Sequence, residues 1–225
     1  MAVAKTRRDF LALGLTGVSG AWLSIHWPEV LAAATHAHQA TTSGAPAKFE
    51  FFSPEQATEI EAFAARIIPT TDTPGAHEAG VIFFIDRALL SFAKDAQKTC
   101  IEGLADLQAH VAETFPGTAK FSALATDQQD QILRSLDEQA NASASGARVR
   151  RARAGASSFF EAIRAFTIMG FLIDPESDRR GNQGAVGWKV IGRDPSHMFQ
   201  PPFGYYDKDY PGWQPAPSAK DKANS

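Results

Sequence analysis

The sequence predicts an all-α protein, a small bundle of about five helices followed by an irregular Pro/Gly/aromatic-rich C-terminal arm. Apolar residues recur every three or four positions over most of residues 49–173, and polar caps and prolines stand where these runs begin and end. No segment sustains the alternation of apolar and polar residues that a strand requires. The 225 residues, 44% of them hydrophobic, suffice for one globular domain.

The first helix of the predicted bundle begins at a capping box. Ser53 precedes Pro54 at the first helical position, and Gln56 follows three residues after Ser53. The Ser53 and Gln56 side chains can therefore each accept the other's backbone N–H. Pro69 ends the helix, whose apolar positions are Ala57, Ile60, Phe63, Ala64 and Ile67.

Four more helices follow from the same periodicity. One carries an apolar face over residues 81–92, and the next runs from about residue 95 to residue 115, before Pro116-Gly117. A second capping box, with Thr126 as the cap and Gln129 three residues later, starts the fourth. A Ser/Ala/Gly stretch at 141–146 separates it from the last helix, whose apolar residues are Phe159, Phe160, Ile163, Phe166 and Met169.

The N-terminus has the features of an export signal. A positively charged start containing Arg7 and Arg8 precedes an uncharged stretch from Phe10 to Ile25, which is shorter than the roughly 20 residues of a membrane span. The recognition residues of this twin-arginine signal are Arg7, Arg8, Phe10 and Leu11. Small residues at 32–34 and again at 38–40 offer cleavage sites. We interpret residues 1–34 as the signal peptide and 35–48 as a linker.

The C-terminal arm spans residues 174–225. Residues 174–217 hold seven of the 13 prolines and all three tyrosines, so this segment is not a long helix. It is also more aromatic than disordered segments usually are. Such an arm packs either over its own bundle or on another protein, and the sequence leaves both alternatives open.

Composition and motifs exclude several classes of function. A net charge of −3 is a poor match for nucleic acid, and the single cysteine, Cys100, excludes an internal disulfide and a Cys-only metal site. The six histidines lack ligand spacing, and the glycines at 181, 184 and 187 do not fit a dinucleotide-binding motif. A basic run at 148–153 is either a solvated helix face or a docking patch. We therefore expect no catalytic residue, no metal and no cofactor in this chain.

One block of sequence carries a specific resemblance, the run from Arg66 to Ala76 that reads R-I-I-P-x-x-D-x-P-G-A. With residues 52–56, 79–86 and 187–192, it resembles the small (gamma) subunit of the membrane-bound gluconate 2-dehydrogenase family, and the twin-arginine leader is similar too. The resemblance spans most of residues 50–192. One departure lies at 180–182, where Arg-Gly-Asn stands in place of the family's usual Gly-Gly-Asn.

The resemblance implies a non-catalytic subunit of a periplasmic sugar or sugar-acid dehydrogenase complex at the outer face of the inner membrane. In that family a large flavoprotein subunit holds FAD and oxidises the substrate, and a multihaem cytochrome c subunit often passes the electrons on. The small subunit supports folding, stability and twin-arginine export of the large one. Gluconate, a ketogluconate, glucose, sorbitol and fructose are all compatible substrates of such a complex.

Two sets of residues are expected to contact the large subunit. The first lies in the family block and comprises Pro69, Asp72, Pro74 and Gly75. The second is the aromatic set of the arm, Trp188, Tyr205, Tyr206, Tyr210 and Trp213. Two alternatives stay open: a stand-alone periplasmic enzyme that uses histidines and carboxylates, and a small-ligand-binding protein with an apolar pocket.

Overall fold

The computed structural model describes residues 20–42, 48–144, 151–173 and 186–190. Every regular element in these ranges is helical, which confirms the predicted all-α bundle. The described parts of residues 49–173 hold five α-helices and two short 3-10 turns: α3 (Pro54–Ile67), α4 (Val81–Leu90), η1 (Lys94–Ala96), α5 (Gln97–Thr114), η2 (Phe121–Ala123), α6 (Thr126–Ala144) and α7 (Arg151–Leu172). Two further helices flank them, α2 (Gly20–Thr42) and α8 (Val186–Val190).

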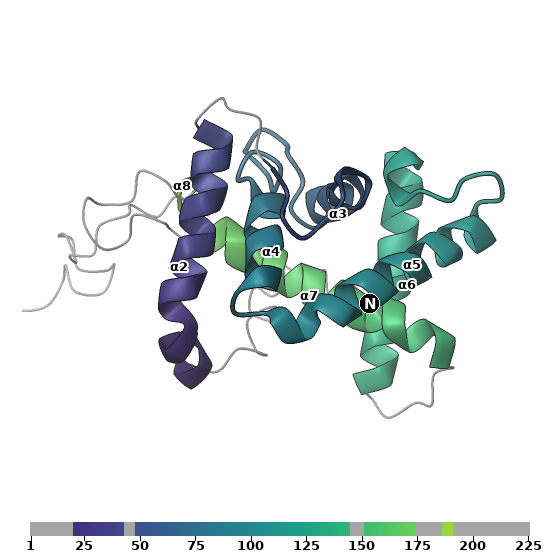
Figure 1. The fold of residues 1–225 in the computed structure, drawn as a ribbon. Coiled ribbons are helices and arrows are strands. Elements are labelled where there is room, and N and C mark those ends of the chain that lie inside the picture. Colours follow the sequence, from purple (N-terminus) through teal and green to yellow (C-terminus); the bar gives the residue numbers. More distant parts are fainter. Residues whose placement is uncertain (1–19, 43–47, 145–150, 174–185, 191–225) are drawn as a thin grey trace, which may run out of the picture.

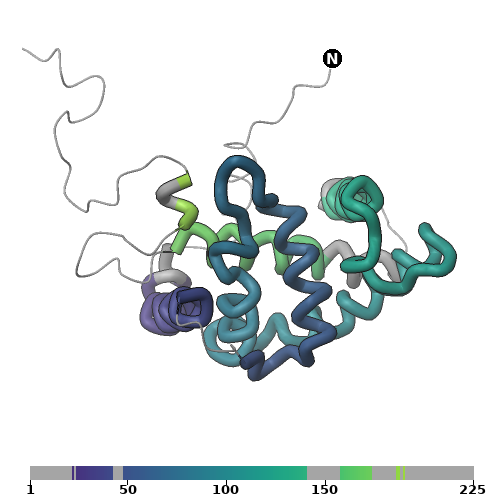
Figure 2. The backbone as a smooth tube through the Cα atoms, turned by 90° about the horizontal axis from the view of Figure 1, so that it is seen from above, coloured from purple at the N-terminus to yellow at the C-terminus, as the bar shows by residue number. Residues whose placement is uncertain are grey.

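Helix α7 runs through the middle of the molecule, where it contacts α3, α4, α5, α6 and α8 (Figure 1). Helices α5 and α6 pack at one end of it, and α2 lies along α4 at the other (Figure 2). The main core gathers where α3, α5 and α7 meet. There the Phe63 ring lies 5.2 Å from that of Phe121 and 5.3 Å from that of Phe159, between ring centroids. Gly103 brings α5 close to α7, since a Cβ there would stand 2.2 Å from the Cβ of Phe159.

The predicted start of α3 is confirmed in detail. The Ser53 hydroxyl accepts the N–H of Gln56 at 3.2 Å, and the Gln56 side chain accepts the N–H of Ser53 at 3.0 Å. Pro54 occupies the first turn. This capping box satisfies two N–H groups that a helix start would otherwise leave without acceptors.

The predicted start of α6 is wrong by one residue. The helix begins at Thr126, and Gln128 rather than Gln129 reaches back, accepting the N–H of Ala125 at 3.0 Å. Gln129 is buried instead, where its side-chain amide donates to the Phe121 carbonyl at 3.1 Å. A buried carbonyl without a donor is costly, so this contact favours the observed register. The helix continues to Ala144, inside the stretch that we expected to separate it from α7.

Two other features differ from the sequence prediction. Phe92 lies beyond the end of α4 at Leu90, although it is buried as expected. Residues 186–190 form the short helix α8 within the segment that we predicted to be an irregular arm. The rest of the C-terminal arm lies outside the described residues.

Helix α2 is the largest difference from the expected organisation. Residues 35–42, which we assigned to a linker, form its last turns. The first proline or glycine after Pro28 is Gly44, so the sequence holds no strong helix breaker across these turns. Along α4 the helix buries Val30, Ala33, Ala34 and Ala37, while Ile25 and Trp27 near its N-terminal end are exposed. None of the described helices combines the length and hydropathy that a membrane span needs.

Candidate functional site

The family block ends in a tightly closed loop between α3 and α4, residues 68–80, which we call the 68–80 loop. The N–H of Ala76 donates to the Ile68 carbonyl at 2.9 Å and closes the loop at its base. Gly75 is buried at this crossing, where a Cβ would stand 2.5 Å from the Thr70 nitrogen and 2.6 Å from the Ile68 oxygen. The loop therefore requires glycine at position 75 because of close backbone approach.

A single carboxylate fixes the interior of the 68–80 loop. One Glu78 oxygen accepts the Thr70 hydroxyl and the Gly75 N–H, each at 2.7 Å. The bond from Thr70, followed by that from Gly75, lowers the pKa of Glu78 below its ordinary value. Glu78 is thus ionised at neutral pH and joins two parts of the loop.

The predicted contact residues of the loop divide into two groups. Pro69, Asp72 and Pro74 are exposed, so a partner can reach them. Gly75 is buried, and its role is to allow the fold of the loop rather than to present a surface. Glu78, whose carboxylate binds Thr70 and Gly75, anchors the loop.

The base of the loop meets α2. Gly80, which precedes α4, has a φ of 64°, and a Cβ there would stand 2.5 Å from the Thr41 methyl group. Beside this contact lies a cavity of about 20 Å³, with His38 and Thr41 of α2 on one side and Glu78 and Phe171 among the residues on the other. That volume is about the room that one water molecule needs.

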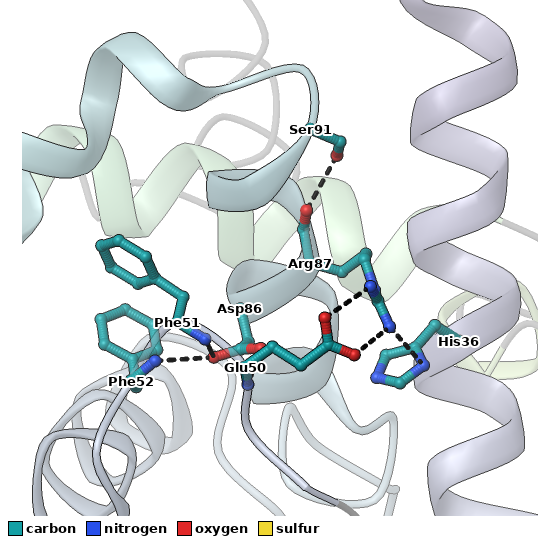
Figure 3. Close-up of polar contacts among 7 residues, drawn as sticks. All are labelled: His36, Glu50, Phe51, Phe52, Asp86, Arg87 and Ser91. Atoms are coloured by element: carbon teal, nitrogen blue, oxygen red, sulfur yellow. Dashed lines mark hydrogen bonds and ion pairs between the residues drawn. The ribbon is translucent and has the colours of Figure 1, made fainter.

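The segment that leads into α3 is held by Asp86 of α4 (Figure 3). Its buried carboxylate accepts three backbone N–H groups, from Glu50 at 2.8 Å, Phe51 at 3.0 Å and Phe52 at 2.9 Å. We call this arrangement the Asp86 clamp. Each bond to an ionised acceptor is stronger than a neutral hydrogen bond, so the clamp fixes the position of the capping box that follows it.

Next to the clamp, Arg87 connects the entry segment to α2 (Figure 3). Its guanidinium donates to both Glu50 oxygens, at 3.0 and 2.8 Å, and lies 3.5 Å from Nδ1 of His36 on α2. Burial, and next the charge of Arg87, lower the pKa of His36, while Glu50 and Asp86 act in the opposite direction. His36 is therefore neutral at pH 7 and can accept a hydrogen bond from Arg87.

Two acidic residues anchor α3 to the α6 region. Glu59, which is buried, accepts the N–H of Phe121 at 2.8 Å, the N–H of Ser122 at 3.3 Å and the Ser122 hydroxyl. Arg66, the first residue of the family block, donates in bidentate fashion to Asp130 at 2.8 and 3.0 Å. The carboxylates of Glu59, Glu78 and Asp86 thus all bind backbone N–H groups of connecting segments.

The histidines and the cysteine are dispersed. His77 pairs with Glu61 at 2.8 Å, His110 bonds to Ser135 at 2.9 Å, and burial raises the pKa of the Cys100 thiol to about 12. Among the described residues no three His, Cys, Asp or Glu side chains gather as metal ligands would. Some predicted residues lie outside the described part of the chain. They are the predicted export-signal residues Arg7, Arg8, Phe10 and Leu11, the side chain of Trp188, and Tyr205, Tyr206, Tyr210 and Trp213.

We expect Asp86→Ala to lower the free energy of unfolding by about 3 kcal/mol or more, because three N–H groups then lose their charged acceptor. Urea unfolding followed by circular dichroism measures this. Glu50→Gln is the matched control. It weakens only the partly exposed pair with Arg87, so it should cost less than about 1 kcal/mol. Equal losses in the two variants would contradict the anchoring role of Asp86.

Acidification should destabilise the contact between α2 and α4. Because the pKa of His36 is lower in the folded chain than its ordinary value of 6.5, the unfolded chain binds a proton at higher pH than the folded one. The His36 contribution to stability is therefore present above pH 6.5 and is lost as the pH falls below it. His36→Gln should flatten the change in urea midpoint between pH 7.5 and 5.5, whereas the control His38→Gln should keep it. An unchanged pH dependence in His36→Gln would contradict this assignment.

Residues 54–195 match the family described as Gluconate 2-dehydrogenase subunit 3. The match covers more than half of the chain and includes the 68–80 loop, Glu59 and Asp86. No curated protein and no solved structure matches this chain. The resemblance carried by the block from Arg66 to Ala76 is thereby confirmed, and the chain belongs to the gluconate 2-dehydrogenase subunit 3 family, whose name describes a subunit of a dehydrogenase complex.

Proposed function

We propose that this chain is the non-catalytic small subunit of a periplasmic FAD-dependent sugar or sugar-acid dehydrogenase complex. In this proposal it assists folding, stability and twin-arginine co-export of the large flavoprotein subunit. The observation that carries the proposal is the family match over residues 54–195. The Arg7-Arg8 leader supports the export part, because twin-arginine transport moves proteins that are already folded.

The use of the acidic residues supports a scaffold role. Glu59, Glu78 and Asp86 accept backbone N–H groups from the η2, 68–80 and entry segments. A carboxylate whose oxygens hold the backbone in this way stabilises connecting segments in one conformation. Such segments suit a protein whose task is to present a fixed surface to a larger one.

The exposed tip of the 68–80 loop is the proposed contact with the large subunit. Pro69 and Pro74 restrict the backbone, and Glu78 and Gly75 hold the loop from inside. A loop that is ordered before binding loses less conformational entropy on association. Asp72 stands exposed between the two prolines and offers a negative charge to a basic group of the partner.

The remaining parts of the complex follow from the family resemblance. FAD belongs to the large subunit, haem c to a multihaem cytochrome subunit, and neither to this chain. The complex would stand at the outer face of the inner membrane. In the arm, Trp188, Tyr205, Tyr206, Tyr210 and Trp213 would add a second contact with the large subunit.

The export role predicts a specific outcome for Arg7→Lys/Arg8→Lys. The change keeps the positive charge but removes the paired guanidinium groups, so this subunit and the flavoprotein should both remain in the cytoplasm. Cell fractionation with antibodies to both proteins, together with dehydrogenase activity, measures this. Lys5→Arg is the control and should leave both proteins exported. A large subunit that still reaches the periplasm at its normal level would contradict the escort role.

The loop contact predicts that Asp72→Arg weakens association with the large subunit by about tenfold, because the substitution reverses an interface charge. The thermal unfolding of the isolated chain should stay unchanged, since Asp72 is exposed. Co-purification and surface plasmon resonance with the purified large subunit measure the two effects. Glu102→Arg on the exposed face of α5 is the matched control. If both variants bind alike, the 68–80 loop is not part of the interface.

A further inference from the structure

Both candidate cleavage sites of the leader lie inside a folded helix. Residues 32–34 are in the middle of α2 and residues 38–40 are near its C-terminal end. Ala33 is 0% exposed and Ala34 is 4% exposed, with their side chains against α4. The residues that a signal peptidase would have to recognise are therefore helical and partly buried.

The packing that buries them is extensive along α2. The buried residues of α2 are spaced three, four and seven apart, so they form one stripe along the helix: Val30, Ala33, Ala34 and Ala37. This stripe covers apolar side chains from α4, α7 and the turn after α4, namely Phe84, Ala88, Phe92, Ala93 and Met169. The Trp22 ring also meets that of Phe92, with 5.6 Å between centroids. Without α2, this second apolar cluster would face water.

Close and polar contacts hold the C-terminal half of α2 as well. His36 lies 3.5 Å from the Arg87 guanidinium, which in turn holds Glu50 (Figure 3). Gly80 lets the start of α4 approach so closely that a Cβ would stand 3.1 Å from the Ala37 carbonyl oxygen. Both views of the backbone place α2 beside α4 (Figures 1 and 2).

Proteases bind their substrates in an extended form, with side chains near the cut seated in pockets of the enzyme. A helix packed against its neighbours has to detach and unwind before it can be cut, so cleavage depends on the population of the opened form. We propose that α2 is a permanent part of the folded protein and that signal peptidase does not remove residues 1–34 or 1–40 once the chain has folded. In the cell this rests on the proposed twin-arginine export, because that route makes folding precede the encounter with the peptidase.

The first test is the intact mass and N-terminal sequence of the subunit isolated with its complex from cells. We expect an N-terminus upstream of Gly20, and a chain that begins at Thr35 or Thr41 would overturn the proposal. Fractionation reports export separately. A chain that stays in the cytoplasm would contradict the proposed function. In that case the cleavage assay on the purified chain, described next, decides whether α2 is protected.

The second test uses the purified full-length chain with purified signal peptidase in detergent. A peptide of residues 1–48 should be cut, while the folded chain should be cut at least about tenfold more slowly. Phe92→Ala/Met169→Ala loosens the surface under α2 without touching either cleavage site, so it should restore much of the cleavage. Ile101→Ala, at a position 39% exposed on α5, is the control and should stay resistant.

Three outcomes of the second test would each overturn the proposal. A folded chain cut as fast as the peptide would mean that α2 is not protected. A peptide that is not cut would mean that burial is not the cause of resistance. A Phe92→Ala/Met169→Ala variant as resistant as the native chain would mean that the packing on α4 does not supply the protection.

Discussion

The arrangement of the helices depends on one buried carboxylate, that of Asp86. It accepts three N–H groups from residues 50–52 and so fixes where the chain enters α3, relative to α4. The next residue, Arg87, binds the Glu50 side chain and lies against His36 of α2. Glu50 is therefore held by its backbone and by its side chain, and two neighbouring residues of α4 join α3 and α2 to one framework.

The same device recurs in two other connecting segments. Glu59 of α3 binds the N–H groups of the η2 segment, and Glu78 binds within the 68–80 loop. In each case several donors rather than a single cation surround the carboxylate, and for Glu59 and Asp86 these donors make its burial tolerable. Carboxylates considered alone in the sequence suggest acid–base chemistry, whereas in the structure these ones fix the connecting segments.

The sequence was sufficient for features that depend on neighbouring residues. Helical periodicity predicted the five helices of residues 49–173, and the Ser53–Gln56 pattern predicted the start of α3. Consecutive glutamines at 128 and 129 left two registers for the start of α6, and the distant Phe121 carbonyl decided between them. The Asp86 clamp joins residues 34 to 36 positions apart, which no local pattern reveals. In the candidate site, Pro69 predicted the end of α3, but the burial of Gly75 and the anchoring by Glu78 depend on contacts that only the folded chain makes.

Helix α2 includes residues that the sequence assigns to a signal peptide, and it also packs as part of the folded domain. The family match begins at residue 54, yet Phe84, Ala88 and Met169 within it are buried beneath α2. The charge and hydropathy of the first residues predict an export signal, but they do not describe what lies against the alanines that follow. Because alanine side chains are short, α2 can approach α4 closely and exclude water from those aromatic and sulfur-containing side chains. Ala33 and Ala34, which resemble part of a cleavage site, thus fit the surface of the family domain, and their burial joins the predicted leader to the stability of the fold.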